Sequence, residues 1–253
     1  MLNYVEYGKE NKYDDDIFFQ KYSQMSRSQQ GLAGAGEWET LRKLLPDFKD
    51  KRVLDLGCGY GWHCIYAMEH GASSVVGVDI SHKMLEVAKE KTHFPQVEYK
   101  CCAIEDVEFP EESFDVILSS LAFHYVADYK ILVKKIYRIL KSGGKLVFTV
   151  EHPVFTAYGT QDWYYNEKGE ILHFPVDNYY YEGKRTAVFL GEKVTKFHRT
   201  LTTYLNTLLS NGFIINHIVE PQPPEYMMDI PGMQDEMRRP MMLIVSANKK
   251  VDR

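Results

Sequence analysis

A carboxylate and three glycines stand close together in residues 53–61, which read Val-Leu-Asp-Leu-Gly-Cys-Gly-Tyr-Gly. The apolar run at their start predicts a strand, and a helix is expected directly after the last glycine. Glycine allows a sharp turn and lets a ligand approach the backbone without meeting a Cβ atom, while the first amides of a helix are free to bind an anionic group. The pattern predicts a nucleotide-type cofactor site formed by Asp55, Gly57, Cys58, Gly59 and Gly61.

Two common phosphate-binding patterns do not fit these residues. The dinucleotide pattern Gly-x-Gly-x-x-Gly would place its third glycine at Trp62 or Cys64, and no Gly-Lys-Ser/Thr sequence ends the loop. Asp55 is unfavourable beside a pyrophosphate, whereas a cofactor with a charged amino-acid end can use it. The alternative is a tight strand-to-helix turn without a ligand, although such a turn needs fewer glycines.

A second acidic residue, Asp79, ends the next predicted strand. It follows the glycines at roughly the 20-residue distance at which an acidic side chain binds the ribose hydroxyls of a nucleotide. Asp79 could instead cap the helix that begins near Ser81, but Ser81 can serve as that cap itself. We therefore expect Asp79 to bind a ribose.

Four stretches resemble, in order, the motifs of class I S-adenosylmethionine (SAM) dependent methyltransferases, in particular the small-molecule, type 11 or UbiE-like group. They are residues 53–61, 75–80, 114–125 and 139–148, within a similar region of roughly residues 30–150. The resemblance implies SAM as the cofactor, S-adenosylhomocysteine (SAH) as its product, and an enzyme that methylates a small-molecule acceptor. The alternative is a SAM- or SAH-binding sensor or scaffold of the same fold without turnover.

The resemblance assigns further residues to the cofactor. Ile80 would pack on the adenine, together with Met84. The turn that begins at Ala103 would contact the same ring, with Glu105 and the amide of Ile104 in place of the Asp-Ala pair that many relatives carry. The methyl-donor position would be flanked by Ser119, Ser120 and Leu121, and the N-terminal segment would contribute Tyr22.

Methyl transfer is an in-line displacement, which is catalysed mainly by positioning, and a base is needed only when the acceptor must lose a proton. The candidate catalytic residues are His124, Glu151 and His152, of which the last two follow the fifth predicted strand and reach the ligand edge of the sheet. His124 has an alternative role as a packing or capping residue, Glu151 and His152 are preferred for substrate contact, and no single catalytic base is assigned. The candidate substrate contacts are Tyr180, His198 and Arg199; Arg199 suits either an acidic substrate or a surface ion pair.

The elements that hold these residues alternate between strand and helix, which predicts a parallel sheet covered on both faces. The expected strands are 52–56, 75–79, 97–101, 114–119 and 145–150, and the expected helices are 37–45, 61–70, 82–92 and 128–140. A helix at 201–210 follows, and then strands at 213–219 and 241–247, which the resemblance pairs as an antiparallel hairpin. The predicted fold is an α/β, Rossmann-like, doubly wound sheet of seven mostly parallel strands.

Two segments depart from this alternation within an expected single domain of residues 1–253. Residues 1–30 are expected to form a mobile helical lid, with a frayed arm as the alternative. Residues 151–200 are rich in aromatic side chains and are expected to form an inserted substrate cap, in which strands 176–181 and 186–197 pair around Gly183. A small satellite core at the sheet edge is the alternative for this insertion.

The composition limits the partners. The formal net charge is −5 and no basic cluster is present, so a nucleic-acid partner is not expected. The four cysteines lack Cys-x-x-Cys spacing, so no metal site is expected, and reduced thiols fit a cytoplasmic protein. The sequence has neither a signal-peptide pattern nor the run of about 18 apolar residues that crosses a membrane. We therefore expect a cytoplasmic enzyme without a membrane partner.

Overall fold

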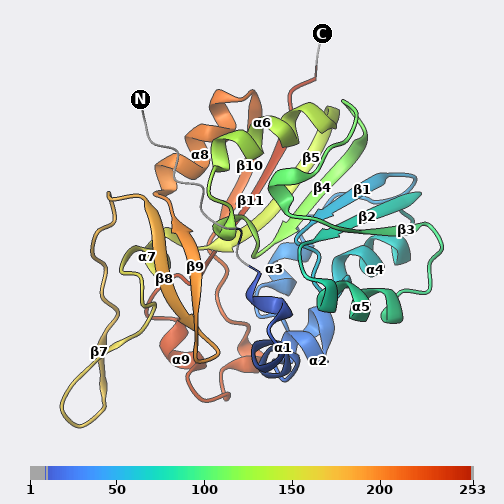
Figure 1. Cartoon of the computed structure of the whole chain (residues 1–253). Helices are drawn as coiled ribbons and strands as arrows, with labels where there is room; N and C mark the ends of the chain where they lie inside the picture. Colours follow the sequence, from blue (N-terminus) through green and yellow to red (C-terminus); the bar gives the residue numbers. More distant parts are fainter. Residues whose placement is uncertain (1–8, 10, 252–253) are drawn as a thin grey trace.

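A seven-stranded sheet forms the centre of the computed structural model, which describes residue 9 and residues 11–251 (Figure 1). The strand order is β10-β11-β5-β4-β1-β2-β3; β1 to β5 run parallel, and β11 pairs antiparallel with β5 and β10. The bounds are Arg52–Leu56 (β1), Ser74–Asp79 (β2), Val97–Cys101 (β3), Phe114–Ser120 (β4), Leu140–Glu151 (β5), Phe213–Val219 (β10) and Met242–Lys249 (β11). The predicted sheet with its antiparallel last pair is confirmed.

Helices cover both faces of this sheet. They are α3 (Trp38–Arg42), α4 (Trp62–Glu69), α5 (His82–Lys91), α6 (Tyr129–Ile139) and α8 (Leu201–Ser210). Because side chains alternate between the two faces of a strand, β5 contributes Phe148 to one buried cluster and Val147 to the other. Residues of α6 and α8 belong to the first cluster, and residues of α3, α4 and α5 belong to the second.

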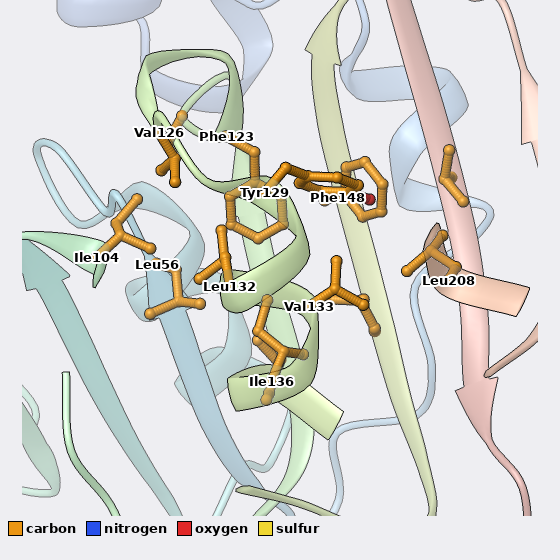
Figure 2. Close-up of a cluster of buried hydrophobic side chains, with 14 of the residues drawn as sticks. Leu56, Ile104, Phe123, Val126, Tyr129, Leu132, Val133, Ile136, Phe148 and Leu208 are labelled. Atoms are coloured by element: carbon orange, nitrogen blue, oxygen red, sulfur yellow. The ribbon is translucent and has the colours of Figure 1, made fainter. Parts of the chain in front are cut away.

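The face of α6 that meets the sheet repeats apolar residues at the i, i+3, i+4, i+7 spacing of one helix face. Tyr129, Leu132, Val133 and Ile136 are each at most 2% exposed. They belong to the same buried cluster as Leu56 of β1 and Phe148 of β5, as Figure 2 shows. This packing holds α6 against the strands whose ends carry the polar residues described below.

Two element boundaries differ from the prediction. The helix expected at 37–45 ends at Arg42, because Pro46 disfavours the helical conformation in the residue before it. The fifth strand begins at Leu140, directly after α6, rather than at residue 145. Gly143 lies inside this strand with φ +72°, and the register with β4 shifts in this region. Gly143 and Gly144 therefore form an irregularity inside β5.

The insertion between β5 and α8 contains one short helix and two small antiparallel sheets. Its elements are α7 (Pro153–Ala157), β6 (Tyr164–Tyr165), β7 (Ile171–His173), β8 (Gly183–Phe189) and β9 (Glu192–His198). The expected hairpin around Gly183 is wrong, because β8 pairs with β9 around Leu190 and Gly191, which both have positive φ. Two consecutive left-handed residues suit the twist of a two-residue hairpin.

Short helices of the N-terminal segment lie near the carboxyl ends of the parallel strands. They are η1 (Lys12–Asp14), α1 (Asp16–Ser23), α2 (Ser26–Gln29) and η2 (Gly31–Gly34). Asp14 ties the segment to the start of α5, because its carboxylate accepts hydrogen bonds from the Ser81 hydroxyl (2.6 Å) and the Lys83 amide (3.1 Å). Residues 1–8 and 10 of the predicted lid lie outside the described residues, and its mobility stays a prediction.

Among residues 9 and 11–251, none of the helices has the length and apolar character that a membrane span requires. The same part of the chain contains no group of three or more His, Cys, Asp and Glu side chains that could hold a metal ion.

Two isoleucines of α6 test the role of the buried face. Ile136 is fully buried, whereas Ile131 is 53% exposed. We expect Ile136→Ala to lower the free energy of unfolding by about 2–5 kcal/mol, because it removes buried methylenes and leaves a cavity. Ile131→Ala, the matched control, should change it by no more than about 0.5 kcal/mol. Urea unfolding measures both; equal losses in the two variants would contradict the assignment of the buried face.

Candidate active site

Two adjoining cavities lie at the carboxyl ends of the parallel strands. The larger, of about 230 Å³, extends from the glycine loop after β1 to Phe189 of β8 and Met241 before β11. The smaller, of about 80 Å³, lies between that loop, η2 and the first turn of α4. Tyr22, Arg27, Gly57, Gly59 and Ser120 form walls of both. Ligands of parallel α/β sheets bind at this edge.

The three glycines of the loop have different reasons to be glycine. All three have positive φ, at +79°, +51° and +76° for Gly57, Gly59 and Gly61. A Cβ atom at Gly57 would overlap Ala122, and one at Gly61 would overlap the Tyr99 hydroxyl, so both positions are also restricted by packing. A Cβ at Gly59 would meet no atom within 4 Å. Gly59 therefore leaves its backbone open to a ligand in the cavity.

Asp79 connects the end of β2 to the glycine loop. One carboxylate oxygen accepts from the Gly59 amide and the other from the Ser81 amide, both at 2.9 Å. The helix cap is Ser81, whose hydroxyl accepts from the Met84 amide at 3.1 Å, as the sequence allowed. Burial raises the pKa of Asp79. Because each oxygen has a lone pair left and Asp79 lines the larger cavity, the carboxylate can accept further hydrogen bonds from ribose hydroxyls.

Asp55 is buried beneath the glycine loop, with 1% of its surface exposed. Its Oδ2 accepts from the Cys64 thiol at 3.5 Å, and its Oδ1 has no hydrogen-bond partner among the described residues. Burial raises the pKa of Asp55 to about 7. An unpartnered buried carboxylate oxygen is costly in its charged form, which fits the raised pKa.

The smaller cavity contains an ion pair that the sequence did not indicate. Arg27 donates to both carboxylate oxygens of Glu37, at 3.0 and 2.9 Å, and both residues line the cavity. The indole nitrogen of Trp62 is buried there without a partner among the described residues. A guanidinium and a carboxylate side by side suit the carboxylate and ammonium of an amino-acid end. Arg27 lies in α2, and Glu37 directly precedes α3. No sequence pattern links these two positions, so only the fold brings the pair together.

Most residues predicted to bind the cofactor line the larger cavity. Besides Gly57, Gly59 and Asp79, they are Tyr22, Ile80, Met84, Ala103, Ile104, Glu105, Ser120 and Leu121. Cys58 lines the smaller cavity. Ser119 lies outside both, because neighbouring strand residues face opposite sides; its hydroxyl donates to the Leu56 carbonyl at 2.7 Å. Asp55 and Gly61 support the loop from below rather than lining a cavity wall.

His124 and Glu151 both line the larger cavity. His124 lies in η4 (Phe123–Tyr125) after β4, and Glu151 is the last residue of β5. Nε2 of His124 is 4.0 Å from Oε1 of Glu151. Oε1 also accepts from Lys196 and Oε2 from Gln161, each at 2.5 Å. Two predicted catalytic residues are thus brought together, with two insertion residues behind them that the sequence did not indicate.

Four other predicted site residues lie outside both cavities. His152 follows Glu151 and faces away from the cavity; its Nδ1 accepts from the Val154 amide (3.1 Å) and caps α7, and its Nε2 is 2.9 Å from Glu220. Tyr180 is 87% exposed.

His198 and Arg199 are both buried and both directed at the protein itself. Nε2 of His198 donates to the Tyr179 carbonyl at 2.9 Å, and its Nδ1 is 2.7 Å from the Thr156 hydroxyl. Arg199 donates to backbone carbonyls, including that of Ala127 at 3.0 Å. The expectation that these side chains reach a substrate is not supported by their positions, because internal partners already occupy their polar atoms.

Known proteins share this architecture. The family model described as "Methyltransferase domain" matches residues 54–148. A Listeria monocytogenes structure assigned to the SAM-dependent methyltransferases is 58% identical, covers 87% of this chain and 99% of its own, and has a TM-score of 0.83. A SAM-dependent methyltransferase structure from Mesorhizobium loti is 41% identical, covers 86% of this chain and 100% of its own, and has a TM-score of 0.80. The chain belongs to the SAM-dependent methyltransferase family.

SAM is therefore the cofactor of this methyltransferase, and the residues at the two cavities fit it. Asp79 lines the larger cavity with lone pairs left for ribose hydroxyls, and Gly59 leaves open space beside its backbone. In the smaller cavity, the indole nitrogen of Trp62 has no partner among the described residues. A curated relative, the ubiquinone biosynthesis O-methyltransferase of Coxiella burnetii, is 36% identical over 112 residues, which are 44% of this chain and 47% of the relative.

Asp79 provides a direct test of cofactor binding. Asp79→Ala removes a charged acceptor, so we expect SAM affinity to fall by about 1.5–3 kcal/mol, tenfold or more. Asp235→Ala, which removes a carboxylate outside both cavities, should leave affinity unchanged. Calorimetry with SAM and SAH measures the effect, and NAD should give no heat of binding. Unaltered SAM affinity in Asp79→Ala would refute the ribose assignment.

The raised pKa of Asp55 predicts a pH-dependent stability. The pKa rises from 3.8 in an exposed carboxyl to about 7 in the folded protein because burial disfavours the charged form. The folded state therefore binds this proton more tightly, and its contribution to stability is present below about pH 4 and is lost as the pH rises to about 7. Asp55→Asn should remove this dependence. Urea unfolding of the ligand-free protein at pH 4, 5.5 and 7 measures it. An equal change in the free energy of unfolding with pH in the wild type and in Asp55→Asn would contradict the assignment.

Proposed function

We propose that this methyltransferase transfers the methyl group of SAM to a small-molecule acceptor in the larger cavity. The observation that carries the proposal is that His124 and Glu151 face the same cavity as Gly59 and Asp79. When bound, SAM supplies a methyl group activated by a positively charged sulfur. The chain then has to orient the acceptor and receive its proton.

His124 acts as a hydrogen-bond donor rather than as the base. Its Nδ1 accepts from the backbone amide of Glu151 at 3.3 Å, so the neutral ring carries its proton on Nε2. Burial lowers the pKa of His124 to about 4, which keeps the ring neutral at pH 7. In this tautomer Nε2–H can orient the acceptor heteroatom, but it cannot take the proton.

Glu151 receives the proton. Burial alone would raise the pKa of its carboxyl, but the charges and hydrogen bonds of its neighbours, including Lys196 and Gln161, together lower it. Glu151 is therefore ionised at neutral pH, and lone pairs of its oxygens remain free on the cavity side. A weak base is sufficient here, because a hydroxyl or amine becomes far more acidic as it takes up the methyl group.

The surroundings of this pair favour a neutral acceptor. The neighbouring walls are apolar or aromatic and consist of Tyr13, Tyr125, Val126, Phe189, Met241 and Met242. Of the described residues, Lys9 and Arg27 line the cavity as cations, and both are already paired, Lys9 with Asp106 and Arg27 with Glu37. Lys196 lies behind Glu151 and is paired with it. A phosphorylated or carboxylated acceptor would leave its charge without a counter-ion. A neutral molecule with one hydroxyl or amine fits best.

The O-methyltransferase name of the Coxiella relative supports a hydroxyl acceptor. The alternative, a SAM- or SAH-binding sensor or scaffold, needs no acceptor space. The larger cavity is lined by His124 and Glu151 as well as by Gly59 and Asp79, and this shared lining favours the enzyme.

A screen with isotopically labelled SAM tests the proposal. We expect methyl transfer to members of a panel of neutral phenols and amines and none to their phosphorylated or carboxylated counterparts. Glu151→Gln should lower kcat by about 100-fold or more, with SAM affinity within a few-fold. The control is His152→Ala, which changes the adjacent residue outside the cavity and should retain turnover. Equal losses in the two variants, or a preference for charged acceptors, would contradict the proposal.

A further inference from the structure

Arg199 is a buried cation whose hydrogen bonds converge on one turn of the backbone. It follows β9 and is 5% exposed. Its guanidinium donates to the carbonyls of Phe123 (3.4 Å), Val126 and Ala127 (3.0 Å), and also to that of Phe197 (3.2 Å). Three of these four carbonyls belong to residues 123–127, the segment that carries His124 and Tyr125.

The remaining surroundings of Arg199 are aromatic. Its guanidinium carbon lies 5.5 Å from the ring centre of Tyr129 and 5.9 Å from that of Tyr204. In the part of the chain that the structure describes, no carboxylate forms an ion pair with it. A buried charge without a counter-ion costs several kcal/mol unless hydrogen bonds replace its water. Here the carbonyls of the turn replace that water, so the position of the turn and the charge depend on each other.

Hydrogen bonds from two sides hold the segment 123–127 in place. On the sheet side, the Leu121 amide donates to the Thr149 carbonyl (3.0 Å), and the Glu151 amide donates to the His124 ring. On the insertion side, Arg199 binds the carbonyls of residues 123, 126 and 127. His124 and Tyr125 lie between the two anchors and line the cavity. Without the second anchor, the outer half of the turn would be free to shift relative to Glu151.

We propose that Arg199 is a positioning residue for methyl transfer: it clamps residues 123–127 so that Nε2 of His124 stays at the acceptor. This inference rests on the proposed function, because the position of His124 affects turnover only if His124 orients the acceptor. A planar guanidinium presents several N–H groups in a rigid fork, and a lysine ammonium cannot reach the same set of carbonyls. A displacement of about 1 Å at a reacting group can lower a rate by about 100-fold.

The test compares Arg199→Lys and Arg199→Met with Arg185→Lys. Arg185 is a matched control, because its guanidinium also donates to backbone carbonyls of the insertion, those of Ala157, Asn178 and Tyr181, but none of the turn 123–127. The measurements are the NMR signals of the His124 ring, SAM affinity by calorimetry, and the separate values of kcat and KM with an acceptor from the screen. Thermal unfolding checks that each variant is folded.

We expect Arg199→Lys to move or broaden the His124 ring signals and to lower kcat by about tenfold to 100-fold, with SAM affinity within a few-fold. Arg185→Lys should do neither. Wild-type His124 signals and kcat in a less stable Arg199→Lys would mean that Arg199 only packs, and would overturn the proposal. The NMR measurement needs no acceptor, so the clamp is judged separately if no turnover is found.

The unsubstituted protein provides a measurement that does not depend on the folding of a variant. A clamped guanidinium rotates slowly, so the Nη atoms of Arg199 should give separate NMR signals. Averaged signals, as a freely rotating guanidinium gives, would overturn the proposal even if both Arg199 variants failed to fold.

Discussion

The end of β1 approaches the end of β4 so closely at Gly57 that a Cβ atom there would overlap Ala122. The amides of Gly57 and Cys58 both donate to the Val78 carbonyl, at 2.8 and 2.9 Å, which brings the end of β2 to the same point. Asp79 then reaches the Gly59 amide. The cofactor half of the site therefore depends on the close approach of the Gly57 backbone to the Ala122 side chain, which only glycine at position 57 permits.

The acceptor half is held by contacts between distant parts of the chain. Lys196 and Glu151 are 45 residues apart, and Arg199 and Val126 are 73 residues apart. Lys196 lies near the end of β9, and Arg199 directly follows that strand, where the insertion leads into α8. The aromatic insertion thus does more than cover the cavity, because it contributes the cation that balances Glu151 and the cation that binds the turn after β4.

The charges of the site are balanced in a way that suits a positively charged cofactor. The cations Arg27 and Lys196 each have a carboxylate partner, and His124 is kept neutral by burial. Asp55 has an oxygen without a partner among the described residues, and Asp79 accepts from backbone amides. The acidic side chains at the glycine loop thus lie on the cofactor side, and of the two Asp79 lines the larger cavity.

The sequence by itself determined the sheet, the glycine loop and the side chains around it. Positions such as Gly57, Asp79 and the Ser81 cap depend on interactions within one strand–loop–helix unit, so a short pattern contains enough information to place them. The same reasoning located the end of β5 but could not decide between Glu151 and His152, because a shift of one residue reverses the side to which a side chain points.

Only the tertiary structure decided which polar residues meet. Arg27 and Glu37, or Lys196 and Glu151, show no mutual pattern in the sequence, because they come from separate elements that packing brings together. Arg199 and His198 are of residue types that often contact substrates, but folding buries them against backbone carbonyls and a hydroxyl. Residue type indicates what a side chain can bind, and the fold decides whether a ligand or the protein itself is within reach.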